Sequence, residues 1–284
     1  MRAWCLLLAA CAGAPDVAED PCEGGGEALY VVRSLYFQRP EEGVDGVCDG
    51  FDLDGIDTPD GGVEGCGIPD FVGPDGGGGV DNAFAYLLPA LEATEAKAVE
   101  SLVQAAIESG ELLITLDQQG VSGPDDACTS LTVGRALGPP LAGAPLIGAD
   151  GLLLAGQTFA PDPSLPATTV DGVALSDGGF EAPLELSLPL QVFDVALDFS
   201  LLEGRVRARL DDDGVLRGLF AGGVDVDYLL SIAAEENVDS ALEGILAQLL
   251  GTWSDLAPDE RGVCTRVSMT FRFEAVPAFW YRSP

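Results

Sequence analysis

A run of aspartates and glycines between residues 44 and 60 is the part of this sequence whose residue types and spacing best suit chemistry. It reads VDGVCDGFDLDGIDTPD, and its aspartates are Asp45, Asp49, Asp52, Asp54, Asp57 and Asp60. Calcium takes about six to eight hard oxygen ligands on a backbone that turns sharply, and alternating aspartate and glycine supply both. Repulsion among so many carboxylates also favours a bound cation. We therefore expect these six aspartates to hold calcium.

The run resembles the DxDG calcium loops of EF-hands, dockerins and thrombospondin repeats. With Gly55 at the sixth loop position, Asp52 and Asp54 stand at ligand positions. Gly50 and Gly61, however, stand where the first ligand and the bidentate glutamate of an EF-hand belong. The expected site is therefore irregular and weak, with a dissociation constant on the order of 10⁻⁴ to 10⁻³ M. Further ligands could come from Asp70, Asp75 and Asp81, and a solvated acidic loop closed by a disulfide is the alternative.

The composition argues against several classes of function. The 284 residues include 13 basic and 47 acidic side chains, a formal charge of -34, and no histidine. Ser-His-Asp and Cys-His nucleophiles and HExxH zinc sites all need an imidazole. The single lysine, Lys97, argues against a Walker A loop or Schiff-base catalysis. Nucleic acid is not expected as a partner, because binding its phosphates requires clustered basic residues. We expect a protein that is not an enzyme, and surface carboxylates explain the acidic residues better than a glycosidase pair does.

The first eleven residues predict export. A basic residue, a short apolar stretch and small residues form an export signal over residues 1–10, too short to span a membrane. Its end, Leu8-Ala9-Ala10-Cys11, resembles a bacterial lipobox. This resemblance implies that Cys11 becomes an acylated N-terminus that anchors the protein in the membrane. Ala12, where an aspartate often signals inner-membrane retention, favours the outer membrane, facing the periplasm or the outside. An ordinary secretory signal cut nearby is the alternative.

Five of the seven cysteines remain once Cys5 is removed and Cys11 is acylated. An oxidising envelope favours their pairing. We expect Cys48 to pair with Cys66, which would close the acidic loop. Cys128 and Cys264 both open strand-like runs and form the second expected pair, and Cys22 is left over.

The mature chain predicts a flexible tether over residues 11–27 and a single α+β domain over residues 28–284. Residues 40–81 contain twelve Asp and Glu, many glycines and no basic residue, so we expect a long loop there. The apolar residues of 81–110 recur at helical spacing and predict one long helix. Two short helices, at 226–235 and 239–250, precede a last strand that alternates strictly from Arg266 to Ala275. We expect a bulged antiparallel sheet packed on one long helix.

Two dipeptides predict tight hairpins, Asp171-Gly172 and Glu203-Gly204. A phase slip in the alternation predicts a β-bulge near Phe193. In the second hairpin, apolar residues face each other, which supports that register. The row Arg205, Arg207 and Arg209 then indicates a solvated strand face rather than an anion site.

In layout the chain resembles uncharacterised Asp/Gly-rich envelope lipoproteins of high-GC Gram-negative bacteria, a resemblance that brings no activity with it. We expect a calcium-stabilised envelope or surface component with a structural or interaction role toward an unknown protein or ligand. The alternative is a carrier of lipids or other hydrophobic ligands. A filled sheet interior favours the first, and a cavity of several hundred Å³, the volume typical of ligand sites, favours the second.

Overall fold

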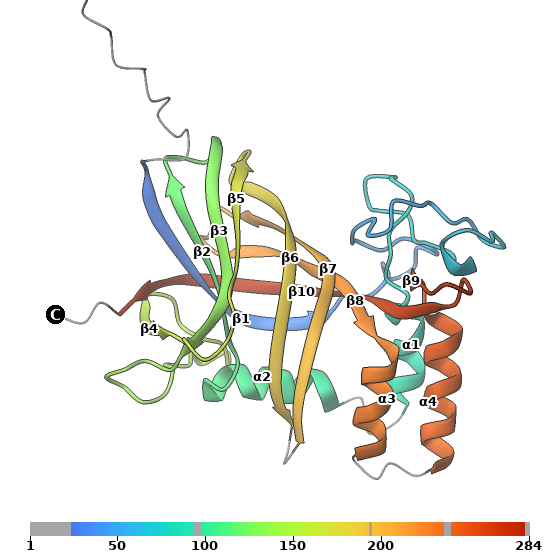
Figure 1. The fold of residues 1–284 in the computed structure, drawn as a ribbon. Coiled ribbons are helices and arrows are strands. Elements are labelled where there is room, and N and C mark those ends of the chain that lie inside the picture. Colours follow the sequence, from blue (N-terminus) through green and yellow to red (C-terminus); the bar gives the residue numbers. More distant parts are fainter. Residues whose placement is uncertain (1–23, 94–97, 193–194, 236–239, 282–284) are drawn as a thin grey trace, which may run out of the picture.

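The computed structural model describes residues 24–93, 98–192, 195–235 and 240–281 (Figure 1). Its main feature is one ten-stranded sheet with the order β1-β2-β3-β4-β10-β8-β7-β6, in which β5 pairs with β3 and β9 with β10. The strands are β1 (Gly26–Phe37), β2 (Leu113–Val121), β3 (Asp126–Leu137), β4 (Gln157–Pro161), β5 (Thr168–Leu175), β6 (Gly179–Val192), β7 (Val195–Leu210), β8 (Leu216–Asp225), β9 (Leu256–Pro258) and β10 (Cys264–Trp280). The pairing of β10 with β4 is parallel and the other described strand pairings are antiparallel, so the sheet is mixed.

Strand β10 is the centre of the sheet. It pairs with β8 from Arg266 to Ala275 and with β1 from Phe271 to Ala278, and its end adjoins β4. The extra pairing with β1 closes a ring made by β1, β2, β3, β4 and β10. The strict alternation in the sequence predicted this strand, and the prediction is confirmed.

The helices are short, and the expected sheet on one long helix is wrong. Among the described residues, 46% lie in strands and 17% in helices. The predicted long helix is two helices, α1 (Phe84–Glu92) and α2 (Val99–Ser109), and each buries its own small stripe. Helix α2 lies on β1, whereas α1 stands beside α3 (Val226–Glu235) and α4 (Ser240–Trp253) at one end of the sheet (Figure 1). The two short helices before the last strand are confirmed.

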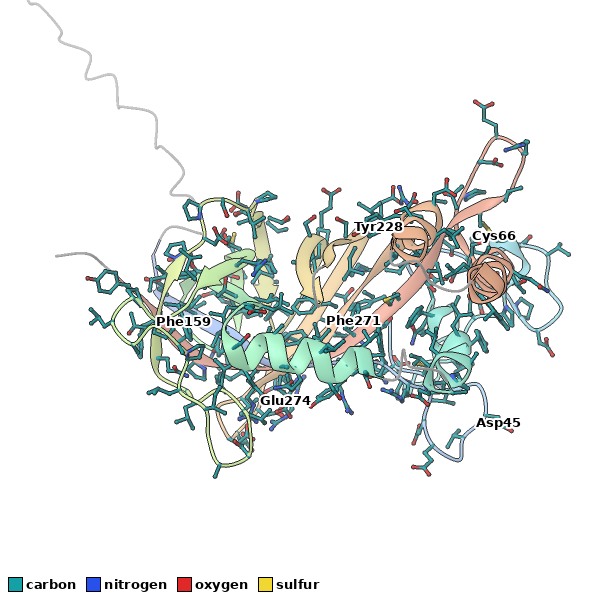
Figure 2. The ribbon with its side chains drawn as sticks, turned by 90° about the horizontal axis from the view of Figure 1, so that it is seen from below. Asp45, Cys66, Phe159, Tyr228, Phe271 and Glu274 are labelled. Carbon is teal, nitrogen blue, oxygen red and sulfur yellow. A yellow bond between two sulfur atoms is a disulfide. The ribbon has the colours of Figure 1, made fainter. Side chains whose placement is uncertain are left out.

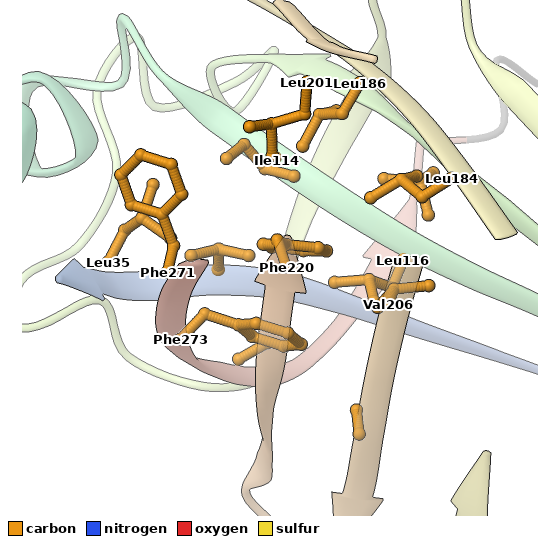
Figure 3. Packing of buried hydrophobic residues seen from close by; sticks show 14 of the residues in the cluster. Leu35, Ile114, Leu116, Leu184, Leu186, Leu201, Val206, Phe220, Phe271 and Phe273 are labelled. Carbon is orange, nitrogen blue, oxygen red and sulfur yellow. The ribbon is translucent and has the colours of Figure 1, made fainter. Parts of the chain in front are cut away.

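The interior of the curved sheet is filled by its own side chains, which explains why no long helix is needed to cover it. Figure 3 shows aliphatic and aromatic residues from β1, β2, β6, β7, β8 and β10 meeting there. Phe220 on β8 and Phe273 on β10 stack with ring centroids 4.2 Å apart, and both are almost fully buried. Each such side chain contributes roughly 1.5–3 kcal/mol by burial. The sheet interior is thus a packed core rather than a ligand cavity.

The two predicted hairpin turns lie elsewhere, and the bulge predicted near Phe193 falls on residues 193–194, outside the described residues. Strand β6 pairs with β7 as far as Val192 opposite Val195, and β7 continues through Glu203-Gly204, where its pairing with β8 shifts register. Gly204 is needed there because a Cβ would collide with the carbonyl oxygen of Ala221 on β8. Gly172 is likewise a bulge in the pairing of β5 with β3. The tight turn is Asp177-Gly178, with φ angles of 50° and 69°.

Both predicted disulfides are wrong. Cys66 is bonded to Cys264, with the two Cα atoms 6.1 Å apart. Cys48 is a buried free thiol, because it packs in a small apolar cluster with Phe71 and neighbouring residues. Cys128 is also disulfide-bonded and so is not available to Cys264. Residues 65–67 form a short 3-10 helix beside β9, which brings Cys66 to the start of β10.

Candidate metal centre

The acidic loop is irregular, as expected, and is held by side chains that pack on the sheet and helices. Phe51 buries its ring against Leu219 and Ala221 on β8. At the far side of the loop, the ring of Phe71 stacks on Tyr86 of α1 with centroids 4.7 Å apart. These anchors hold the two ends of residues 51–71, which include Asp52 and Asp54.

The end of the loop docks on β10. Asn82 Oδ1 accepts a hydrogen bond from the backbone N–H of Thr270, and the Ala83 N–H donates to Ser268 Oγ at 2.6 Å. The Asp81 N–H donates to the carbonyl oxygen of Phe51 at 2.8 Å, which brings residues 51–54 against residue 81. Segments almost thirty residues apart are therefore held side by side.

Three carboxylates meet at this junction. One oxygen from each of Asp52, Asp54 and Asp81 lies within 4.8 Å of the others, and Asp81 is only 2% exposed. Such a spacing lets a single cation contact all three, because calcium ligands lie about 2.3–2.6 Å from the ion.

Each of these carboxylates is oriented by the backbone through one oxygen. Gly55 N–H donates to Asp52 Oδ1 at 2.6 Å, and Ile56 N–H donates to Asp54 Oδ1 at 2.8 Å. Leu53 N–H donates to Asp81 Oδ2 at 2.6 Å. Within the described part of the chain, the second oxygen of each carboxylate accepts no hydrogen bond. Three preoriented oxygens thus remain for a ligand.

The carboxylates carry charge that no described basic residue neutralises. None of the described arginines forms an ion pair with Asp52, Asp54 or Asp81. Burial is the main reason why the pKa of Asp81 is raised to about 8. The hydrogen bond from the Leu53 N–H lowers this pKa, and the nearby carboxylates of Asp255 and Asp54 raise it. Burial also raises the pKa of Asp54. A bound divalent cation would lower these pKa values, because it favours the ionised carboxylates.

Two further acids, the half-buried Asp70 and the buried Asp255, lie close enough to the cluster to raise the pKa of Asp81. Burial raises the pKa of Asp70 to about 6, and the carboxylates of Asp54, Asp57 and Asp52 add to the shift. Burial raises the pKa of Asp255 to about 7, although both of its oxygens accept hydrogen bonds from Ser268. Asp255 lies just after α4 and outside the loop, so the loop's spacing gave no signal for it.

A buried hydroxyl beside the cluster lacks a partner. Thr58 is 1% exposed, and its Oγ1 makes no hydrogen bond in the described part of the structure. The same Oγ1 and Asp54 Oδ2 both flank Gly65, where a Cβ would contact them. An unsatisfied buried oxygen costs about 1–3 kcal/mol. This oxygen lies on the side of the cluster where Asp54 Oδ2 is, so it is a candidate donor to a cation bound there.

Only part of the predicted site comes together. Asp52 and Asp54 do, with Asp81, which was expected as a further ligand. Asp49 is instead paired with Arg207, its Oδ1 lying 2.6 Å from Nη2. Asp57 lies beside Gly78 and near Asp70. The remaining predicted ligands, Asp45 and Asp60, are exposed and outside the cluster, as is Asp75, which caps its own turn through Gly77. Figure 2 shows Asp45 on an outer loop, well apart from Cys66.

A second feature of the structure is an apolar cavity of about 490 Å³ where the four helices meet the end of β1. Its apolar lining consists of Phe37, Phe84, Leu87, Leu88, Leu91, Val99, Leu229, Leu249 and Leu250. Arg39 lies at its polar edge and binds Glu92 and Glu100, each at 2.8 Å. The cavity therefore combines an apolar wall with one charged edge.

Comparison with known proteins supplies no family or fold relative: no family model, curated protein or solved structure matches the chain. Among the described helices, none has the length and apolar character needed to cross a membrane.

Proposed function

We propose that this protein is a non-enzymatic lipoprotein of the bacterial outer membrane, anchored through Cys11, in which calcium stabilises the acidic loop. Its role is structural or one of interaction with an unknown protein or ligand, on the periplasmic or outer face. The lipobox-like segment supports the anchor. Labelling with a palmitate analogue tests it, because the label should enter the protein and be lost in C11S.

The observation that carries the calcium proposal is the junction of Asp52 and Asp54 with buried Asp81. Their free oxygens, together with the unpartnered Thr58 Oγ1, are the hard oxygen donors that calcium prefers. Magnesium demands near-octahedral geometry and keeps its waters, so it suits this irregular loop less well.

Isothermal titration of the purified full chain with calcium tests this site. We expect one saturable event with a dissociation constant on the order of 10⁻⁴ to 10⁻³ M. D81N should abolish it, whereas D45N, which removes the same charge from an exposed position in the same loop, should leave it unchanged. Unchanged heat in D81N, or no heat in the unmodified protein, would contradict the proposal.

The apolar cavity favours a second candidate function, the carriage of a lipid or another hydrophobic ligand. A volume of about 490 Å³ falls in the usual range of small-molecule sites, roughly 300–1,000 Å³. The cavity lies among the helices and not in the sheet interior, which is filled.

Mass spectrometry of material extracted from the purified protein tests carriage. A bound lipid should be recovered from the unmodified protein and lost in L91W, which places an indole in the cavity. L141W is the matched control, because Leu141 is 89% exposed and outside the cavity. Equal recovery from both variants, or none from the unmodified protein, would count against a carrier.

A further inference from the structure

The outer face of the sheet concentrates arginines in a protein that is otherwise strongly acidic. In the strand register, Arg207 on β7 faces Leu219 on β8, and Leu219 faces Arg272 on β10. One step along the strands, Arg209 directly faces Arg217. Because adjacent strands lie about 4.8 Å apart, the stems of Arg207 and Arg272 are separated by roughly 10 Å.

These arginines line an open groove of about 710 Å³. Leu219 and Gly218 contribute to its floor. Gln38 approaches from the end of β1, Asp49 from the acidic loop, and Ala174 and Ser176 from β5 and the turn after it. Four guanidinium groups and two carboxylates, those of Asp49 and Glu181, line the groove, so its wall is locally positive.

The charges on this wall are unequally neutralised. Arg217 is held by three carboxylates, those of Asp211, Asp213 and Glu274. Arg272, in contrast, has no carboxylate within 4.0 Å among the described residues, and Glu100, whose pKa its charge helps to lower, is already bound to Arg39. Arg272 is also an exposed residue of the central strand. An unpaired guanidinium in a groove offers up to five donors to an anion.

Arg209 is the second group able to bind. It directly faces Arg217 across the strands, and these like charges are balanced by Asp177 on Arg209 and by the three carboxylates on Arg217. Its partner, Asp177, has a side chain 81% exposed, and such surface pairs contribute about 0–1 kcal/mol. An incoming oxyanion can therefore replace Asp177 at little cost.

Arg207 is fixed in position at the edge of the groove. Its guanidinium lies 4.9 Å from the ring centroid of Phe51, and its Nη2 donates to Asp49 Oδ1 and to the Gly50 carbonyl oxygen. The loop thus orients one wall of the groove without using all five donors of the guanidinium.

From this arrangement we propose that the groove binds a small polyvalent oxyanion, a di- or tricarboxylate or a phosphoryl compound, between Arg272, Arg209 and Arg207. The guanidinium fork matches both carboxylate and phosphoryl oxygens. Arg207 and Arg209, which the sequence placed on a solvated strand face, are then part of an anion site. The proposal does not depend on calcium or on the apolar cavity.

Calorimetric titration of the full chain with citrate, and separately with inorganic pyrophosphate, tests the groove in calcium-free buffer, because both probes bind calcium. Binding of one probe and not the other identifies the carboxylate or the phosphoryl class. R272Q should weaken binding about ten- to hundredfold, the effect of losing hydrogen bonds from a charged donor. R261Q is the matched control, because Arg261 lies outside the groove and its side chain is 85% exposed.

A variant with the opposite effect sharpens the test. D49N removes a carboxylate from the groove and frees Arg207, so it should bind the same probe several times more tightly, while leaving the calcium response intact. The proposal is overturned if neither probe binds at 10 mM and low salt, if R272Q and R261Q bind alike, or if D49N binds more weakly while its melting temperature is unchanged.

Discussion

The protein should lose stability as pH rises and gain stability when calcium binds, and D81N should weaken the first effect and remove the second. Asp81 has a pKa of about 8 in the folded protein and 3.8 as its ordinary value, so the folded state holds a proton that the unfolded state has lost. Without calcium, stability therefore falls as pH rises from about 4 to 8. Asp255 and Asp70 are raised as well and act in the same direction.

The size of the effect follows from the shift. A change of one pKa unit corresponds to about 1.4 kcal/mol, so the rise from 3.8 to about 8 sets an upper limit of about 6 kcal/mol for Asp81. In a protein of this size, 1 kcal/mol moves the melting temperature by roughly 2–4 °C. Calcium at 10 mM, with a dissociation constant on the order of 10⁻⁴ to 10⁻³ M, adds about 1.4–2.7 kcal/mol to the free energy of unfolding.

Melting temperatures at pH 5 and pH 8, in EDTA and in 10 mM calcium, measure the effects of pH and of calcium on stability. The unmodified protein should melt several degrees lower at pH 8 than at pH 5 in EDTA, and calcium should restore about 3–10 °C at pH 8. D81N should melt above the unmodified protein at pH 8 in EDTA, because the introduced amide keeps an acceptor for the Leu53 N–H without the buried charge. It should not respond to calcium.

D45N is the matched control and should behave as the unmodified protein does. The reasoning is refuted if the melting temperature in EDTA rises between pH 5 and pH 8. It is also refuted if D81N gains as much from calcium as the unmodified protein.

Two further predictions concern the framework. Replacing both Cys66 and Cys264 by serine opens a link spanning 198 residues, which should lower the free energy of unfolding by up to about 5 kcal/mol in chemical denaturation; an unchanged midpoint would show that packing alone holds the loop to β10. G204A should lower the free energy of unfolding by about 1–3 kcal/mol, because its Cβ would push against the backbone of Ala221. G123A, at a site with no atom within 4 Å, is its neutral control.

The elements with strong periodicity were predictable from the sequence. Alternation identified β10, and the short helices α3 and α4 fell where apolar residues recur at helical spacing. The break between α1 and α2 was not predictable, because both segments continue the same apolar period and only their contacts with different parts of the sheet separate them.

The predictions of the hairpin turns were wrong for a physical reason. An Asp-Gly pair supplies the positive φ angles that a two-residue turn requires, and a β-bulge uses the same freedom. Asp171-Gly172 and Asp177-Gly178 are therefore indistinguishable by type, and the structure uses the first as a bulge and the second as the turn.

Part of the candidate metal centre was predictable from the sequence. The spacing of Asp52 and Asp54 around Gly55 marked them as ligands, and both join the cluster. The contribution of Asp81 depends on the docking of residues 81–83 against β10, which the local spacing does not encode. Asp49 has the same local sequence surroundings as Asp52 and Asp54 but forms an ion pair with Arg207 of a distant strand.

The pairing of β1 with β10 has a consequence for how the protein folds. Leu29 faces Ala278, so the central contacts of the sheet join segments separated by almost the whole described chain. Contacts this distant in sequence cannot form early, and folding of such sheets is slow. The chain cannot close its core before residues 264–280 are available, so a partly synthesised or truncated chain would expose the edges of β1 and β8. Such open edges invite aggregation.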